Sequence, residues 1–284
     1  MAIGLRPLRN QKKMADALHI VVCAGIVPDP LQTLEPTTGP SGPGIKNEMA
    51  LPAVLDPWAA SALYEAAALA AKHQGSKLWL VSLSAKAKLQ QVMMTVAQKV
   101  AFELAPVDGP IGGFADAHAT AEALAEAIAA LPGLDRTRLL LFGGWESATR
   151  GAGVTLSLIG ERLGIGDQFQ AVDQIEVRDD GSFEVLERVE GGRHQVSRCA
   201  GAPAVLGWAT GNLGEPRNNP QIGMANMRAM LPALQKARSA TLDGNTLRYV
   251  QVNLPKQQRT TRVAKDMSAD EIAGELVEWI GKDS

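Results

Sequence analysis

The sequence contains few of the residues that usually mark catalysis, metal binding or membrane insertion. It has two cysteines and four histidines among 284 residues, and its 28 Lys and Arg residues nearly balance its 30 Asp and Glu residues. No apolar run approaches the roughly 20 residues that a membrane helix needs, and the N-terminus lacks the apolar core of a signal peptide. Because the charge is balanced, no overall field attracts nucleic acid or an anionic membrane. These absences predict a globular cytoplasmic protein that neither inserts into a membrane nor binds nucleic acid.

The cysteines and histidines form no recognisable reactive group in the sequence. Cys23 and Cys199 each lie in an apolar run without CxxC or Cys/His spacing, so we expect buried free thiols rather than a disulfide or a metal site. A nucleophile and its base would need a histidine near a serine or cysteine. None of the four histidines stands in such a setting, namely His19, His73, His118 and His194. We therefore expect no metal and no catalytic residue in this chain.

The residues that are present predict an α/β fold. A hydrophobic content of 46% over this length allows a sizeable core in one or two domains. The β-branched run at 18–25 is typical of a strand buried on both faces. Asp56-Pro57 is a strong helix start, because aspartate caps free amides and proline suits the first helical position. Further strands are expected at 77–83 and 138–142, and further helices at about 85–104 and 116–130. This alternation predicts a doubly wound, mostly parallel, Rossmann-like sheet.

The second half of the chain has a different pattern. Three short segments with β-turn residues between them predict an antiparallel meander around 168–200, followed by a buried strand at 204–208. A basic, extended stretch later leads to a final helix that opens at the capping box Ser268-Ala269-Asp270-Glu271. The predicted organisation is a frayed N-terminal tail at 1–17, an α/β domain at 18–236, and a C-terminal arm with its helix at 237–284.

The stretch from Leu139 to Gly153 is the strongest candidate for a ligand site. An apolar run breaks at Gly143-Gly144, passes through hydroxyl residues and restarts at Gly151-Ala152-Gly153, which is how a parallel sheet presents backbone amides to an anion. If this strand neighbours the 18–25 strand where the strand order reverses, Ala24-Gly25 faces the paired glycines across a crevice. The sequence contains no dinucleotide-binding and no P-loop glycine motif. The residues alone therefore indicate a nucleotide-type binder without catalytic groups.

Four short motifs follow one another along the chain. They are Val81-Ser82 after a strand, Glu190-Gly191-Gly192 in the meander, Leu213-Gly214-Glu215-Pro216-Arg217 after a buried strand, and Gln258-Arg259-Thr260-Thr261-Arg262-Val263 before the final helix. Over about residues 18–282 this order resembles the electron transfer flavoprotein beta subunit, whose members carry an acidic-Gly-Gly turn, an Asn-Glu-Pro-Arg segment and a Pro-Gln-Arg-Thr segment. The resemblance implies a fold of the adenine-nucleotide-binding type.

The resemblance also implies a partner and a cofactor. In this family an alpha subunit holds most of the contacts to FAD, and the beta subunit supports it and usually buries a structural AMP. The heterodimer passes electrons from a dehydrogenase to a quinone-linked or other acceptor, and the redox chemistry belongs to the flavin and its donor. A chain without catalytic residues suits this role. The basic C-terminal stretch is then an arm laid across the alpha subunit.

By resemblance, the AMP site maps onto four parts of the chain. The positions are Ala24, Asp56, Leu83, Ser147, Thr149, Arg150, Gly151, Ala152 and Gly153. The loop from Ser147 to Gly153 is shorter than in the family and lacks the family's acidic run, so Arg150 would supply a charge to the phosphate. An empty or remodelled site with Arg150 in solvent remains an alternative. No second FAD and no NAD is expected here.

Contacts to partner proteins are implied at a second set of positions. These are Arg188, Glu215, Pro216, Arg217, Ile222, Arg259 and Arg262. Ile222 falls where the family presents a leucine that anchors dehydrogenases, in a segment that departs from the family pattern, which favours a dedicated electron donor. Arg188 falls where the family has a glutamate, so we expect a reversed ion pair with an acid on the alpha subunit.

A different class of function also suits the first half of the chain. A stand-alone adenine-nucleotide-binding or ATP-hydrolysing protein of the universal-stress type shares the broad fold expected there. The roughly 120 C-terminal residues distinguish the two classes, because a stand-alone sensor needs no meander, no Glu-Pro-Arg loop and no basic arm.

Overall fold

The computed structural model describes residues 17–39, 42–110, 115–149, 151–242, 250, 251, 253 and 263–282. The chain separates into two compact units, Met1–Val252 and Asn253–Ser284. The sequence analysis instead places the boundary between the domain and the C-terminal arm at 236, where the α/β pattern of the sequence ends. In the described residues the first unit is an α/β domain, and the second contains a single helix.

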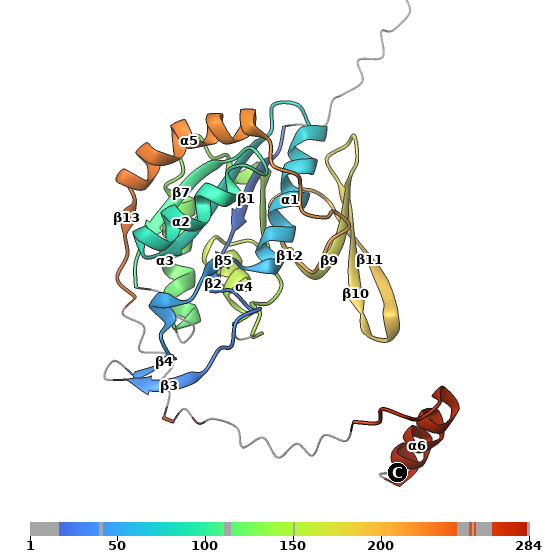
Figure 1. Ribbon diagram of the computed structural model, residues 1–284. Coiled ribbons are helices and arrows are strands. Elements are labelled where there is room, and N and C mark those ends of the chain that lie inside the picture. The colour runs from blue at the N-terminus through green and yellow to red at the C-terminus, as the bar shows by residue number, and fades with distance from the viewer. Residues whose placement is uncertain are drawn as a thin grey trace, which may run out of the picture. The chain divides into compact units, whose positions relative to one another are not determined.

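A nine-stranded sheet forms the centre of the first unit (Figure 1). Its strands are, in order across the sheet, β11 (Arg193–Cys199), β10 (Phe183–Val189), β9 (Gln168–Val177), β12 (Ala204–Trp208), β8 (Leu139–Gly144), β1 (His19–Cys23), β6 (Lys77–Ser84), β7 (Glu103–Asp108) and β13 (Arg238–Ser239). Every pairing from β9 across to β13 is parallel, whereas β9, β10 and β11 pair antiparallel. The protein is therefore α/β with a mostly parallel sheet, which is compatible with a Rossmann-like fold.

Helices cover both faces of the parallel strands. One face carries α1 (Pro57–Lys72), α2 (Lys86–Val96) and α5 (Pro220–Gln235), and the other carries α3 (Ala117–Ala129) and α4 (Thr155–Arg162). The central strand β1 alternates between the two cores. Ile20 and Val22 pack in the first, and Val21 and Cys23 pack in the second. This two-sided burial explains why β1 is apolar without interruption.

The order of the strands reverses at β1. The chain runs from β1 to β6 and β7 on one side, then returns through α3 to β8, which pairs with β1 on the other side. The register places Val21 opposite Leu141 and Cys23 opposite Gly143. The two strands are thus neighbours at the reversal, which is the condition on which the expected crevice depends. Ligands of open α/β sheets bind outside the carboxyl ends of strands at such a point.

The end of α2 differs from the sequence-based expectation. Apolar residues continue at helical spacing to Val100, which predicts a helix over 85–104, yet α2 stops earlier and β7 follows. The reason is the buried amide of Asn226 on α5. It donates to the carbonyl oxygens of Ala97 and Val100, both at 2.7 Å, and accepts from the backbone N–H of Phe102 at 3.4 Å. Because these bonds satisfy the backbone where the helix ends, they stabilise the turn into β7.

The proline-rich segment between β1 and α1 forms two short pairs of antiparallel strands. The strand β2 (Ile26–Pro28) pairs with β5 (Ala53–Leu55), and β3 (Pro36–Gly39) pairs with β4 (Gly42–Ile45). A 3₁₀ turn, η1 (Glu48–Ala50), connects β4 to β5. Both β2 and β5 contact α2. These contacts place the segment beside the carboxyl end of β6.

The second unit contains α6 (Ala269–Lys282). It begins at the predicted capping box, where the Glu271 N–H donates to Ser268 Oγ at 3.4 Å and the Ser268 N–H donates to Glu271 Oε2 at 2.8 Å. The N–H and the hydroxyl of Ser268 both donate to Glu271 Oε2, and these two hydrogen bonds hold the pKa of the Glu271 carboxyl below its ordinary value. Among the described residues, no helix has the length and apolar character that crossing a membrane requires.

Candidate functional site

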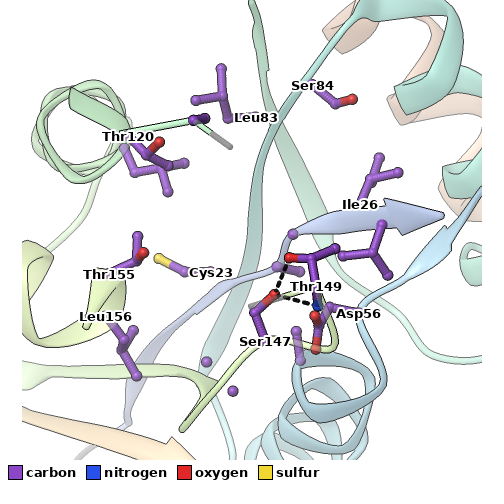
Figure 2. Close-up of a pocket in the computed structure, with 18 of the residues that line it drawn as sticks. Cys23, Ile26, Asp56, Leu83, Ser84, Thr120, Ser147, Thr149, Thr155 and Leu156 are labelled. Carbon is purple, nitrogen blue, oxygen red and sulfur yellow. Dashed lines mark hydrogen bonds between the residues drawn. The ribbon is translucent and has the colours of Figure 1, made fainter. Parts of the chain in front are cut away.

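A cavity lies at the carboxyl ends of β1, β6 and β8 (Figure 2). In this view one side carries Ile26, Asp56, Ser147 and Thr149, the opposite side carries Cys23, Thr155 and Leu156, and Leu83 and Thr120 lie at the top. The cavity has a volume of about 160 Å³. Pockets that enclose a drug-sized ligand measure roughly 300–1,000 Å³. This cavity therefore has room for one ring system, and the rest of a nucleotide would lie towards solvent.

Asp56 joins the first helix to the loop after β8. Its Oδ1 accepts from the Trp58 N–H at 3.1 Å, which caps α1, and its Oδ2 accepts from the Ala148 N–H at 2.9 Å. The side chain is almost fully buried, and burial raises the pKa of the carboxyl, although these amide hydrogen bonds act in the opposite direction. Asp56 thus lines the cavity while both of its oxygens hold backbone amides.

The loop after β8 uses several of its own polar groups internally. Ser147 Oγ and Thr149 Oγ1 are 2.8 Å apart, and the Thr149 N–H donates to Ser147 Oγ at 3.2 Å. The Gly151 N–H donates to the Ser147 carbonyl oxygen at 2.8 Å. The amide of Gly151, which the sequence suggests for a phosphate, and the amide of Thr149 are therefore engaged within the loop.

The last residues of this loop lead into α4. Gly153 has a φ of +65°, and a Cβ added there would lie 2.4 Å from the Trp145 carbonyl oxygen. Gly151 also has a positive φ, of +62°, but an added Cβ would keep 3.7 Å from its nearest neighbour. The close return of the loop onto Trp145 therefore requires glycine at 153. Ala152 is exposed, and Arg150 lies outside the described residues.

The two remaining positions expected for AMP lie at the carboxyl ends of β1 and β6. The Ala24 N–H donates to the Val81 carbonyl oxygen at 3.0 Å, and the Ala24 carbonyl oxygen accepts from Ser82 Oγ at 2.7 Å. Leu83, almost fully buried, forms part of the cavity wall. The backbone of Ala24 is thus tied to β6, and its carbonyl oxygen keeps one lone pair for a further bond.

Hydroxyl groups that the sequence reasoning missed also line the cavity. Ser84 ends β6 and Thr155 begins α4, so both lie at the carboxyl edge, where a search of strand ends and helix starts could have found them. Thr120 lies in an alanine-rich helix and donates to the Asp116 carbonyl oxygen at 2.7 Å. No local signal in the sequence marks Thr120 as part of a site.

Charged side chains are distributed unevenly around the cavity. In the described part of its lining the carboxylates are Glu48, Asp56 and Glu146, and Lys88 is the one cation. The Nζ atom of Lys88 lies 3.7 Å from Oε1 of Glu48, and the two side chains are 17% and 22% exposed. Glu48 comes from η1 and Lys88 from α2. Sequence reasoning missed this pair because only the packing of β2 and β5 on α2 brings it together.

Cys23 contributes the one thiol in the described lining of the cavity. Cys23 lines the cavity, and burial raises the pKa of its thiol to about 12, so the thiol stays protonated at neutral pH. No histidine is found in the described lining. His19 instead accepts from the Asp135 N–H at 2.8 Å through Nδ1, and burial lowers its pKa. Within the described residues, no group of His, Cys, Asp and Glu could hold a metal ion.

Arg188, expected to contact a partner, makes its ion pair within this chain. It donates to Asp173 from Nε at 3.0 Å and from Nη2 at 2.9 Å, and to Thr210 Oγ1 at 2.8 Å. The Asp173 side chain is 6% exposed and also contacts Nε2 of His194 at 3.0 Å. The pairing of Arg188 with an acid of another subunit stays a prediction, and Asp173 is the acid that it meets here.

The segment that contains Glu215 is held firmly on the first unit. Oε1 of Glu65, on α1, accepts from the N–H groups of Asn212 and Leu213 at 2.7 and 3.0 Å. Glu215 pairs with Lys99 at 2.9 Å. These hydrogen bonds and this ion pair hold the loop in one conformation, which pre-organises the surface around Glu215.

The remaining expected partner contacts are distributed between a groove and the surface. Pro216 and Ile222 line a groove of about 740 Å³, together with Tyr64, whose pKa is raised to about 12 by burial and then by the nearby Glu215 carboxylate. Arg217 is exposed. Arg259 and Arg262 lie outside the described residues.

Neither protein-family models nor curated proteins match this chain when compared with it. Its function is therefore inferred from its residues, its fold and its cavity.

Proposed function

We propose that this chain is the beta subunit of a heterodimeric electron transfer flavoprotein. In this role it supports an alpha subunit that carries FAD and passes electrons from a dedicated dehydrogenase to a quinone-linked or other acceptor. The flavin supplies the redox chemistry, and the beta subunit positions and stabilises the flavin-carrying partner. The four motifs in order and the α/β fold, with an antiparallel meander beside its parallel strands, support this proposal.

The four motifs in their order along the chain are the observation that carries the proposal, and the apolar face of α6 agrees with it. Ile272, Leu276 and Trp279 recur at helical spacing along this helix. A single helix of this length is marginally stable in water, and an apolar face of this kind is stabilised when it packs against another surface. A second subunit provides such a surface, whereas a stand-alone nucleotide-binding protein has no need of this helix.

The cavity at the reversal of the strands supports a structural AMP in this subunit. Its volume suits one ring system such as adenine, its wall offers apolar contacts from Leu83 and Leu124, and its hydroxyls offer hydrogen bonds to a sugar. A complete FAD is much larger than this space. Adenine-nucleotide binding in the cavity is therefore proposed to be structural, with the flavin held mainly by the alpha subunit.

Co-expression with the product of the adjacent open reading frame tests the proposal. We expect a yellow complex with one flavin per heterodimer, measured by flavin absorbance and native mass spectrometry. AMP should appear by chromatography after the complex is denatured. A colourless monomer that hydrolyses ATP would instead support the stand-alone function.

A further inference from the structure

We infer that Lys88 binds the anionic group of the ligand in the cavity, and that Glu48 competes with the ligand for this ammonium group. The inference rests on the proposed binding of an adenine nucleotide, and it assigns a specificity residue outside the loop after β8. Lys88 belongs to α2, which follows β6, whereas the loop at 147–153 follows β8. Since β1 lies between β6 and β8, these two candidate anion sites are on opposite sides of the central strand.

Among the described residues, the charges on the two sides favour the α2 side for an anion. On the side of β8, Oε2 of Glu146 lies next to Gly151, 3.7 Å from where a Cβ of that residue would stand. The amides at 148, 149 and 151 are engaged by Asp56 and Ser147. A phosphate there would face a carboxylate and few available donors in the described loop. On the side of α2, the cavity presents an ammonium group.

The geometry of the ion pair leaves that ammonium group available. The 3.7 Å separation between Lys88 Nζ and Glu48 Oε1 exceeds hydrogen-bond distance. The lysine side chain is only 17% exposed, so its charge is partly desolvated and interacts more strongly than a surface charge does. A phosphate oxygen at hydrogen-bond distance would form a shorter, charge-assisted contact with the same group. Glu48, 22% exposed, could turn towards solvent when this happens.

The size of the cavity fits this orientation of the ligand. One ring system fills the enclosed space against the apolar wall, and the remaining groups extend to where solvent begins. Both Lys88 and Glu48 line the cavity and keep partial contact with solvent, so they lie where an extending phosphate would pass. The ligand class that follows is an adenine nucleoside with one anionic group, for which Lys88 provides the charge recognition.

Cys23 provides a direct measure of occupancy, because its thiol lines the same cavity. In the full-length chain with Cys199→Ser, the rate at which N-ethylmaleimide modifies Cys23 can be followed by intact mass spectrometry. Titration with AMP and with adenosine then gives the affinity of each from the protection of the thiol. The pKa of about 12 makes this modification slow, which suits a protection experiment.

We expect AMP to protect Cys23 at lower concentrations than adenosine does. Lys88→Ala should weaken AMP by about tenfold and leave adenosine unchanged, because one charge-assisted contact is lost. Glu48→Gln should tighten AMP, and Lys88→Arg should retain most of the wild-type preference. Lys46→Ala is the matched control, since Lys46 pairs with Glu35 in the neighbouring segment but does not line the cavity. Thermal unfolding of each variant checks that it is folded.

Two results would overturn the inference. If Lys88→Ala keeps the wild-type ratio of AMP to adenosine affinity while Arg150→Ala loses it, the anion binds at the loop after β8. If neither compound protects Cys23 in the wild-type chain, the cavity is not an adenine-nucleotide site. In either case a yellow heterodimer on co-expression would still support the electron transfer role, so the two proposals fail separately.

Discussion

The side-chain amide of Asn226 donates to the carbonyl oxygen of Val100 at 2.7 Å, although 126 positions separate the two residues in the chain. Through this contact and its bonds to Ala97 and Phe102, a residue of α5 decides where α2 ends and β7 begins. An uncapped helix end would leave buried carbonyl groups without partners. The boundary of a local element is thus set by a long-range contact.

The first prediction concerns this cap. Asn226→Ala removes three hydrogen bonds and leaves backbone groups unpaired in a buried site. We expect a loss of about 3 kcal/mol in the free energy of unfolding, measured by urea denaturation. Asn218→Ala, at an exposed position of the preceding loop, is the control and should change it by less than about 0.5 kcal/mol. Equal effects of the two variants would contradict the role given to Asn226.

The second prediction concerns Asp56 and pH. Burial raises the pKa of this carboxyl in the folded state, so the folded chain retains this proton more strongly than the unfolded chain does. The contribution of Asp56 to stability is therefore complete below the ordinary value of 3.8, and it is lost as the pH rises through the raised pKa. Asp56→Asn removes this titration.

As the pH rises above 3.8, we expect the free energy of unfolding of the wild type to fall relative to that of Asp56→Asn. The variant should still be less stable by about 1–2 kcal/mol at low pH, because an amide nitrogen must face one of the two backbone N–H groups. Urea denaturation from pH 3 upwards measures this difference. A difference that stays constant with pH would contradict the assigned pKa shift.

The third prediction separates two glycines of the loop after β8. Gly153→Ala places a Cβ 2.4 Å from the Trp145 carbonyl oxygen and also strains a positive φ. Gly151→Ala imposes the strain without the clash. We expect losses of about 3 and 1 kcal/mol in the free energy of unfolding, respectively. Gly214→Ala, with open space around its Cβ and no positive φ, is the control. The order of the three losses tests the described path of the loop.

The fourth prediction tests the ion pair of Arg188. Arg188→Ala leaves the nearly buried Asp173 carboxylate without its bidentate partner, so we expect a loss of about 2 kcal/mol in stability. The double variant with Asp173→Asn should cost less than the sum of the two single changes, and this coupling is measured by a double-mutant cycle. An additive cycle, together with lost affinity for the alpha subunit, would instead assign the ion pair of Arg188 to an acid of that subunit.

The fifth prediction concerns the heterodimer. Trp279→Ala should weaken assembly of the proposed heterodimer by about tenfold or more, because large aromatic side chains dominate the binding energy of many interfaces. Native mass spectrometry with the alpha subunit measures the change. Val277→Ala, at a more exposed position (71%) on the flank of the same helix, should have little effect. Equal binding by both variants would contradict a docking role for this face.

Much of the fold could be predicted because its causes are local. The cap at Asp56 and the capping box at Ser268 each involve residues within three positions, so sequence spacing is sufficient to detect them. The strand β1 is buried on both faces, and this burial can be recognised in the sequence as a continuous run of apolar residues. The ranges of β9, β10 and β11 also agree with the expected meander, because turn residues separate the strands.

The sequence predicted where in the fold the candidate site lies, but only some of the residues that line it. Glycines that follow an apolar strand, at 25 and at 143–144, indicate the carboxyl edge of a parallel sheet, and the pairing of Cys23 with Gly143 places the crevice there. The residues of the loop itself were visible in the sequence. The hydroxyl of Thr120 was not, because it comes from a helix that folds back over the sheet.

The amino-acid sequence by itself determined where strands and helices begin, which strand is buried on both sides, and at which edge of the sheet a ligand can bind. Only the tertiary structure decided that Asn226 ends α2, that Lys88 faces Glu48 beside the cavity, and that Arg188 pairs with Asp173. The physical reason is distance along the chain. Capping, turns and periodic burial act between neighbours, whereas the contacts of Asn226 and Lys88 join distant segments, and that of Arg188 depends on the register of β10 against β9.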